Sequence, residues 1–367
     1  MSKVVIADIV RTPWGKPCGS MEKFLSSDLG AAALKLLLKR TGIAPEKVDQ
    51  VVFGQAHPST FPNNIGHFAW LKAELPVEVP GYTVQSNTVS SLQALRNAYY
   101  LIAGGNEDVV IAGGADSYST APFVMRDVRN HFKPSDRWVL DSLDEAECCT
   151  QPEPMSRLEQ YIASYGETQT EAQKTFAGES RKKAAGFASS CAEAIASVSY
   201  TDRKKGEIVI SNDEWLFDPC DEALAPYADG AAVAMLLSEE KAKEFGVSTL
   251  ATVEGFASAA SDVKKPELAG VAAVEKLLKA QGKTMADIAV LEIIENSAAD
   301  VEAVEKALGA TAKVNPLGGA LAYGKNDGAE GIAMVQRLVA SLQKGEYGIA
   351  CIYSAGGLGM AALIRKN

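Results

Sequence analysis

Residues 90–114 read SSLQALRNAYYLIAGGNEDVVIAGG, and residues 329–359 read AEGIAMVQRLVASLQKGEYGIACIYSAGGLG. In both stretches apolar residues recur at helical spacing, a glycine then breaks the helix, and a compact apolar run predicts a buried strand that leads into a double glycine. The two copies lie about 240 residues apart, which is too long a period for a solenoid. We therefore predict two similar α/β halves that pack together, with chance similarity between α/β units as the alternative.

The sequence before the first copy shows the same alternation of strand and helix. Residues 4–10 are a compact apolar run, Asp28 is a natural N-cap for a helix over 29–40, and Gly42 stops that helix. Residues 48–53 then predict the next buried strand.

The chain after the first half divides into two parts. The stretch 121–225 is more polar and broken, with one clear helix over 170–188, and is interpreted as an insertion into the first half. Strand, helix and strand patterns return at 250–256, 270–280 and 288–294. The expected domains are an N-terminal half (1–120 plus 226–248), the insertion (121–225) and a C-terminal half (249–367).

Composition narrows the class of protein. A net charge of -10 and a pI near 5.0 argue against nucleic acid as a partner. No window suits a membrane span, and charges near the start differ from a signal peptide, so a cytoplasmic location without membrane contact is expected. Six cysteines without a CxxC pair and three histidines predict neither a metal site nor structural disulfides. The basic run 203–205 is either a solvated turn or a phosphate ligand.

Several glycine-rich stretches carry a resemblance to a known family. They are TVQSNTVSSLQA (83–94) with AGG (112–114), NPLGGA (315–320), GKNDGAEG (324–331), RTP (11–13), DGAA (229–232) and GGLG (356–359). In order and spacing these stretches resemble the thiolase superfamily, which includes acetyl-CoA acetyltransferases and 3-ketoacyl-CoA thiolases. The resemblance covers nearly the whole chain.

The resemblance implies a fold and a ligand. The implied fold is α/β, with duplicated βαβαβαββ halves in a five-layered α/β/α/β/α core and an inserted loop domain that helps to bind coenzyme A. The implied ligand is coenzyme A or an acyl-CoA thioester without a metal, and the implied assembly is a homodimer or homotetramer. The insertion is shorter than is usual for the family. The implied cofactor-binding positions are Met155, Arg203, Ser258, Asn315 and Gly357.

The family's reactive positions carry other residues in this sequence. Thr88 stands where the resemblance places the nucleophilic cysteine, Lys325 where it places the base histidine, and Tyr353 where it places a second cysteine. A hydroxyl is much less acidic than a thiol and needs a dedicated base, and a lysine acts as a base only if its pKa is strongly lowered. Glu295 matches the family, but the oxyanion-hole asparagine is displaced by two positions to Asn296, so we expect that hole not to form as usual.

Other nucleophiles and bases are weaker candidates. Cys351 lies two residues from the second cysteine position and is expected to be a packing residue. Cys148 and Cys149 lie just before Met155 and could reach a ligand, although loop cysteines are more often incidental. The histidines match no family acid or base and are interpreted as surface or capping residues; they are His57, His67 and His131.

Two hypotheses about function follow. The first is a non-catalytic or partner-dependent subunit that binds acyl-CoA or supports an active thiolase-like or accessory chain in a hetero-oligomer, since the three reactive positions have changed together while the glycines remain. The alternative is an acyl-CoA C-acyltransferase with altered chemistry, in which Thr88 accepts the acyl group and Lys325 is the base, as in Ser–Lys catalysis. A reaction without a covalent intermediate, beside Glu295 or Tyr353, is a third possibility.

Overall fold

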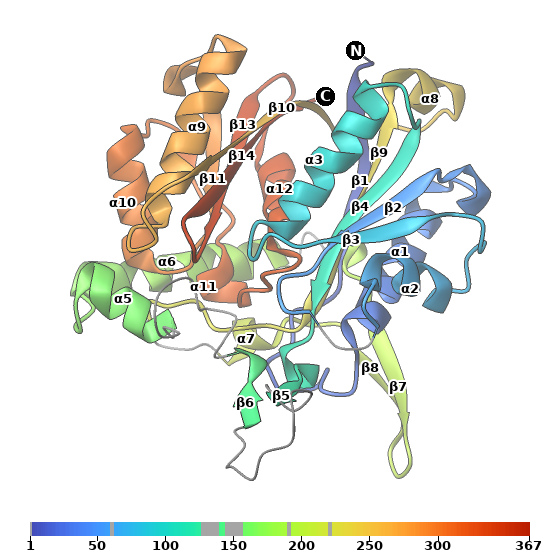
Figure 1. Ribbon diagram of the computed structural model, residues 1–367, viewed down its shortest axis with the longest axis horizontal. Coiled ribbons are helices and arrows are strands. Elements are labelled where there is room, and N and C mark those ends of the chain that lie inside the picture. Colours follow the sequence, from blue (N-terminus) through green and yellow to red (C-terminus); the bar gives the residue numbers. More distant parts are fainter. Residues whose placement is uncertain (1, 59–61, 126–138, 144–156, 189–191, 219–221) are drawn as a thin grey trace, which may run out of the picture.

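The structure is a computed structural model that describes residues 2–58, 62–125, 139–143, 157–188, 192–218 and 222–367. Two halves with the same order of elements form its core (Figure 1). The first half contains β1 (Val4–Arg11), α1 (Ser26–Thr41), β2 (Gln50–Gly54), α2 (Ile65–Lys72), β3 (Gly81–Val84), α3 (Ser90–Ala103), β4 (Val109–Asp116), β9 (Gly230–Ser238) and α8 (Glu239–Glu244). The second contains β10 (Ala251–Ala260), α9 (Glu267–Gln281), β11 (Ile288–Ile293), α10 (Ala298–Leu308), β12 (Lys313–Val314), α11 (Ala320–Tyr323), α12 (Glu330–Ser341), β13 (Tyr347–Ser354) and β14 (Leu358–Lys366).

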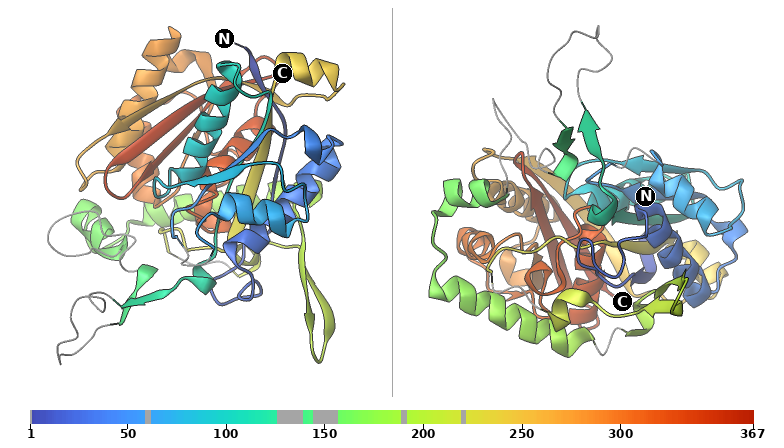
Figure 2. Two further views of the ribbon diagram at one scale, coloured as in Figure 1. Left: turned by 45° about the vertical axis from the view of Figure 1, so that its right-hand side comes forward. Right: turned by 90° about the horizontal axis from the view of Figure 1, so that it is seen from below.

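The elements between β4 and β9 lie outside the main sheet. They are β5 (Phe123–Met125), β6 (Val139–Asp141), α5 (Arg157–Tyr165), α6 (Glu171–Ala188), β7 (Val198–Asp202), β8 (Gly206–Ile210) and α7 (Glu214–Phe217). The β7–β8 hairpin projects away from the core, while α6 runs along the lower edge of the second half (Figures 1 and 2). The domain boundaries themselves stay a prediction.

Strand pairing demonstrates the duplication. The strand order is β12-β11-β13-β14-β10-β1-β9-β4-β2-β3, and β1 joins β10 only through Val4–Ile6 and Ala251–Val253. The pairing is the same on each side of that junction. Strands β3, β2 and β4 are parallel to one another, and so are β12, β11 and β13. The other two strands of each half, β9 and β1 in the first and β14 and β10 in the second, pair antiparallel. The prediction of two similar halves is confirmed.

The halves stack as five layers (Figure 1). Helices α3 and α12 form the middle layer, between the strands of the first half and those of the second. Helices α1 and α2 cover the outer face of the first half, and α9 and α10 cover the outer face of the second. The central layer is tight because α12 begins with Glu330 and Gly331. A Cβ at Gly331 would lie 2.7 Å from the backbone nitrogen of Leu92 in α3, so a larger side chain does not fit there. The five-layered α/β/α/β/α core implied by the sequence is confirmed.

Two local predictions need correction. Asp28 is not the N-cap of α1, because the helix begins at Ser26 and the Asp28 carboxylate accepts the Leu25 N–H from inside the first turn at 2.9 Å. Strand β11 ends at Ile293, one residue before the predicted end of that strand at position 294, so Asn296 lies in the following loop.

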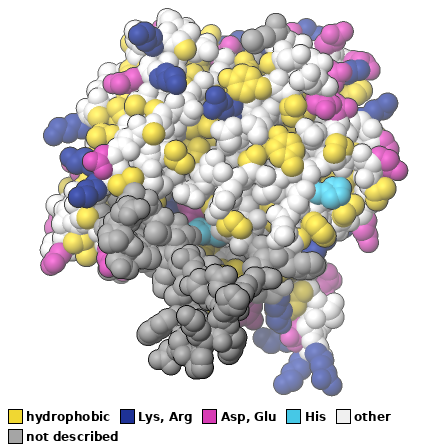
Figure 3. All heavy atoms as spheres, in the orientation of Figure 1, with side chains coloured by type: hydrophobic (Ala, Val, Ile, Leu, Met, Phe, Trp, Pro, Cys, Tyr) yellow, Lys and Arg dark blue, Asp and Glu magenta, His cyan; other side chains and the backbone are white. Residues whose placement is uncertain are grey.

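The face in Figure 3 carries both acidic and basic side chains, mostly around its margin, with hydrophobic and uncharged groups in the middle. None of the helices in the described ranges combines the length and the apolar character that a membrane crossing requires.

Candidate active site at the start of α3

A tight turn between β3 and α3 positions Thr88. Asn87 has a φ of 50°, in the left-handed region that asparagine tolerates better than most residues. The Ser90 hydroxyl accepts the Ser86 N–H at 2.8 Å and donates to the Asn87 carbonyl oxygen, which closes the turn. Thr88 is 5% exposed and lies two residues before α3, so this residue is buried near the positive end of a 14-residue helix.

The loop that follows β2 runs directly along the start of α3. A Cβ at Gly54 would lie 2.4 Å from the backbone of Ser90. The Ser90 hydroxyl lies 3.3 Å from the Gln55 carbonyl oxygen, and the Gln85 amide donates to the Ala56 carbonyl oxygen at 3.4 Å. The segment that ends in His57 is therefore in contact with the turn that carries Thr88.

The loop 324–331 approaches the same place from the second half. The side-chain amide of Asn326 donates to the carbonyl oxygens of Asp116 and Ala228 at 2.9 and 2.7 Å, which pins this loop to the ends of β4 and β9. Its last residue, Gly331, packs against Leu92 of α3. Thr88 and Lys325 thus belong to segments that meet between the strands of the two halves.

Lys325 forms a buried ion pair. Its Nζ lies 3.0 Å from Oδ1 of Asp327, and the two side chains are 5% and 4% exposed. The ammonium group also lies 5.5 Å from the centre of the Tyr227 ring. A lysine that faces a carboxylate in a buried site is stabilised as a cation, so this arrangement disfavours a neutral Lys325 that acts as a base.

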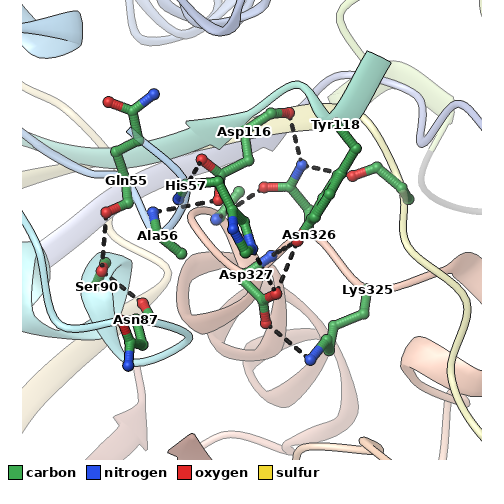
Figure 4. Close-up of polar contacts among 12 residues, drawn as sticks. Gln55, Ala56, His57, Asn87, Ser90, Asp116, Tyr118, Lys325, Asn326 and Asp327 are labelled. Atoms are coloured by element: carbon green, nitrogen blue, oxygen red, sulfur yellow. Dashed lines mark hydrogen bonds and ion pairs between the residues drawn. The ribbon is translucent and has the colours of Figure 1, made fainter. Parts of the chain in front are cut away.

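His57 contacts the other oxygen of the same carboxylate (Figure 4). Its Nε2 lies 3.1 Å from Oδ2 of Asp327, and Tyr118 donates to that oxygen at 2.7 Å. Burial alone would raise the pKa of Asp327, but the charge of Lys325 and the hydrogen bonds from His57 and Tyr118 hold it well below its usual range. Asp327 is therefore ionised and organises three side chains around it.

Asp116, at the end of β4, fixes the backbone of the His57 loop. Its carboxylate oxygens accept the N–H groups of Ala56 and His57 at 3.2 Å each. Complete burial raises its pKa to about 7; the nearby His57 opposes this rise and the charge of Asp327 adds to it. Two carboxyl groups with opposite pKa shifts thus flank one histidine, an arrangement typical of proton-transfer sites.

Glu295 is buried among three hydrogen-bond donors. It accepts hydrogen bonds from Ser180 at 2.8 Å, Asn315 at 2.9 Å and the Leu321 N–H at 3.1 Å, and burial raises its pKa. Asn315 also exchanges two hydrogen bonds with the backbone of Ile293. Glu295 and Asn315 therefore tie the glycine-rich turn before α11 to β11 and α6.

Tyr353 and Cys351 both lie against Gly270 of α9. Each is fully buried, and burial raises the pKa of the Cys351 thiol to about 12, which supports a packing role. Burial also raises the pKa of Tyr353, and the charge of Asp300 adds to this rise. Burial raises the pKa of Asp300 to about 6.

Comparison with known proteins identifies the family. The model of the thiolase N-terminal domain matches residues 4–240, and the model of the thiolase C-terminal domain matches residues 247–366. The chain belongs to the thiolase family. It is 33% identical to a probable acetyl-CoA acyltransferase of Staphylococcus aureus (strain bovine RF122 / ET3-1) and 32% identical to an acetyl-CoA acetyltransferase of Cupriavidus necator, with complete coverage of both chains in each case.

Solved thiolase-family structures superpose on the whole chain. The Bacillus anthracis acetyl-CoA acetyltransferase matches with a TM-score of 0.93 and 29% identity, and human mitochondrial 3-ketoacyl-CoA thiolase with 0.90 and 26%. Both alignments cover 100% of this chain and 99% of the other. The expectation of a non-catalytic or partner-dependent subunit is wrong, because proteins matched over their full length are named as acyltransferases and thiolases.

The structure places the described cofactor positions that the thiolase resemblance implied on different elements. Arg203 is exposed between β7 and β8. Ser258 of β10 accepts a hydrogen bond from Arg96 at 3.2 Å, and Gly357, with a φ of 72°, forms the turn between β13 and β14. Asn315 is 1% exposed. Several predicted positions lie outside the described residues: Met155, Cys148, Cys149 and His131.

Sequence reasoning missed the His57 network in this thiolase. The signal was available, since His57 follows the carboxyl end of one buried strand and Asp116 ends another. Strands β2 and β4 are parallel neighbours, with Gly54 beside Gly114, so residues at their carboxyl ends must meet. His67, in contrast, lies in α2 and its backbone N–H donates to Asn64. In the residues that the structure describes, no cluster of His, Cys, Asp or Glu could hold a metal ion.

Proposed function

We propose that the chain is an acyl-CoA C-acyltransferase that makes or cleaves a carbon–carbon bond beside a thioester carbonyl, with Thr88 as acyl acceptor. The position of Thr88 carries the proposal. Its buried hydroxyl lies near the start of α3, where the loop after β2 and the loop before α12 meet. The acyltransferase names of full-length relatives support the same reaction class.

The chemistry requires two proton transfers. Thr88 Oγ bonds to the thioester carbonyl carbon, its proton leaves to a base, and coenzyme A departs as a thiolate that takes the proton back. In the second half-reaction a base removes a proton from the methyl carbon of acetyl-CoA, and the resulting carbanion attacks the acyl-Thr88 ester. The Thr88 alkoxide that is released recovers the proton, so atoms and charges balance.

The local charges favour this chemistry. The N-terminus of α3 is a source of positive potential near Thr88. This potential stabilises negative charge that develops on a hydroxyl or carbonyl oxygen. We propose coenzyme A or an acyl-CoA as the ligand, a homodimer or homotetramer as the assembly and the cytoplasm as the location.

Thiolysis tests the function directly. Purified protein is mixed with acetoacetyl-CoA and coenzyme A, and the loss of the 3-ketoacyl thioester is followed together with the formation of acetyl-CoA. We expect turnover by the wild-type protein and a loss of at least about 100-fold in Thr88→Ala. Thr41→Ala is the matched control, because the Thr41 hydroxyl bonds only within the end of α1. Equal turnover by Thr88→Ala and the wild type, or none by either, contradicts the proposal.

A further inference from the structure

We propose that His57 is the base of this site and that Asp327 and Lys325 are positioning residues that keep its ring neutral and oriented. The inference rests on the proposed acyltransferase function and names the group that moves the protons. It replaces Lys325 as the candidate base. The first observation behind it is that His57, which is 270 positions from Asp327 in the sequence, meets that carboxylate inside the protein.

The contact with Asp327 fixes the tautomer of His57. An ionised carboxylate accepts but does not donate, so the Nε2 that lies 3.1 Å from Asp327 carries the ring proton. In the neutral ring the lone pair is then on Nδ1. A carboxylate that holds an imidazole in one tautomer is the same arrangement that makes histidine an effective base in hydrolytic triads.

Lys325 explains why the ring can stay neutral. A buried carboxylate beside a histidine ordinarily favours the protonated imidazolium, which has no lone pair to accept a proton. The Lys325 ammonium, 3.0 Å from the other oxygen, already balances the charge of Asp327. The Lys325 ammonium therefore helps His57 to act as a base, because it neutralises the Asp327 carboxylate. A deprotonated Lys325 would leave the charge of Asp327 without a counter-charge.

Contacts on several sides fix the position of the His57 ring. Tyr118 packs on the His57 ring with centroids 4.8 Å apart, Tyr227 lies 6.1 Å away, and Asp116 accepts the His57 backbone N–H. The residue before His57, Ala56, accepts a hydrogen bond from Gln85 in the turn that carries Thr88. Figure 4 shows His57 between the Ser90 turn and the Asp327–Lys325 pair. The charged and titratable groups that face the ring are Asp116, Asp327, Lys325, Tyr118 and Tyr227.

In the proposed step His57 Nδ1 accepts the Thr88 hydroxyl proton as the C–O bond forms, and the imidazolium returns it to the departing thiolate. The same nitrogen then takes the methyl proton of acetyl-CoA and passes it to Thr88 Oγ when the carbon–carbon bond forms. No further reactant is needed. The second step predicts an observable partial reaction, the exchange of acetyl-CoA methyl protons with solvent.

The test compares His57→Asn with His67→Asn, a histidine from the next helix. Thiolysis of acetoacetyl-CoA, methyl-proton exchange of acetyl-CoA in D2O and the Kd for acetyl-CoA are measured for each. We expect His57→Asn to lose at least about 100-fold in turnover and in exchange with less than about twofold change in Kd, and His67→Asn to match the wild type. Wild-type rates in His57→Asn overturn this inference alone, whereas a wild type without turnover or exchange overturns the proposed function beneath it.

If His57→Asn does not fold, the pH profile of kcat/KM tests whether His57 is the base. Removal of the Lys325 charge favours the protonated ring, so in Lys325→Met the acidic limb of kcat/KM moves to higher pH by at least about one unit. Lys72→Met, which removes a lysine from a pair with Asp28 in which both side chains are about one-third exposed, leaves the acidic limb in place. An acidic limb in Lys325→Met that coincides with that of the wild type overturns the assignment.

Discussion

The charge state of Lys325 can be tested through stability. Lys325→Met removes the ammonium group but keeps a side chain of similar length, and it leaves the Asp327 carboxylate buried without its ion-pair partner. Two unit charges 3.0 Å apart attract by about 5 kcal/mol at an effective dielectric constant of about 20. Because His57 and Tyr118 remain as hydrogen-bond donors, we expect the free energy of unfolding to fall by about 3–4 kcal/mol near pH 8.

The loss depends on pH in a defined direction. In the wild type the pKa of Asp327 is depressed, so its stabilising contribution is present above about pH 4 and is lost only as the pH falls below that value. In Lys325→Met burial is no longer opposed by the lysine, so the pKa of Asp327 rises. The variant then takes up a proton at low pH, and its deficit is smaller near pH 5 than near pH 8.

Urea unfolding followed by circular dichroism measures both effects, with each variant compared with the wild type at the same pH. The double variant Lys325→Met/Asp327→Asn recovers at least half of the loss, because no unpaired charge remains. Lys72→Met is the control, since both members of its pair with Asp28 are about one-third exposed and such pairs contribute about 1 kcal/mol or less. If Lys325→Met lowers the free energy of unfolding by less than about 1 kcal/mol, and equally at both pH values, Lys325 is not charged in the wild type and is again a candidate for the base.

Two further predictions concern the buried groups and the central layer. Burial raises the pKa of Asp116 to about 7, so the folded protein retains a proton that the unfolded chain releases above about pH 4. We expect stability to fall by about 2–3 kcal/mol between about pH 5 and pH 8, seen as a lower Tm, and a constant Tm contradicts this shift. Gly331→Ala places a Cβ 2.7 Å from the Leu92 nitrogen, and we expect it to lower the free energy of unfolding in urea by about 1–3 kcal/mol. Gly178→Ala is the control, because the space around its Cβ is open, and we expect it to be neutral or stabilising. Equal effects of the two substitutions argue against a tight α3–α12 contact.

The fold was predictable because its signals are local and repeated. Helical spacing, a glycine stop and an apolar strand occur in both copies, and each half folds them in the same way. The errors came at element ends. Asp28 caps α1 from within the first turn, and β11 stops at Ile293, because the side-chain contacts that end an element are not visible in periodicity.

The site was only partly predictable. The resemblance directed attention to Thr88 and Lys325, and the segments that carry them do meet. His57 was interpreted as a surface or capping residue because it matches no acid or base of the family, and its contact with Asp327 joins residues 270 positions apart. Glu295 was named from the resemblance, and periodicity gave no sign of the three hydrogen bonds that hold it. Contacts of this kind depend on how the two halves pack against each other. A sequence read one residue at a time does not reveal that packing.

Mapping of the acyl group tests the central claim most directly. The wild-type protein is incubated with acetyl-CoA, quenched in acid to preserve an ester, digested, and sequenced by tandem mass spectrometry, with Thr88→Ala treated in parallel. The account predicts an acetyl group on the Thr88 hydroxyl that is absent from Thr88→Ala and disappears when unlabelled coenzyme A is added before the quench. An acetyl group on a cysteine instead, or an unmodified Thr88 in protein that turns over acetoacetyl-CoA, would contradict it.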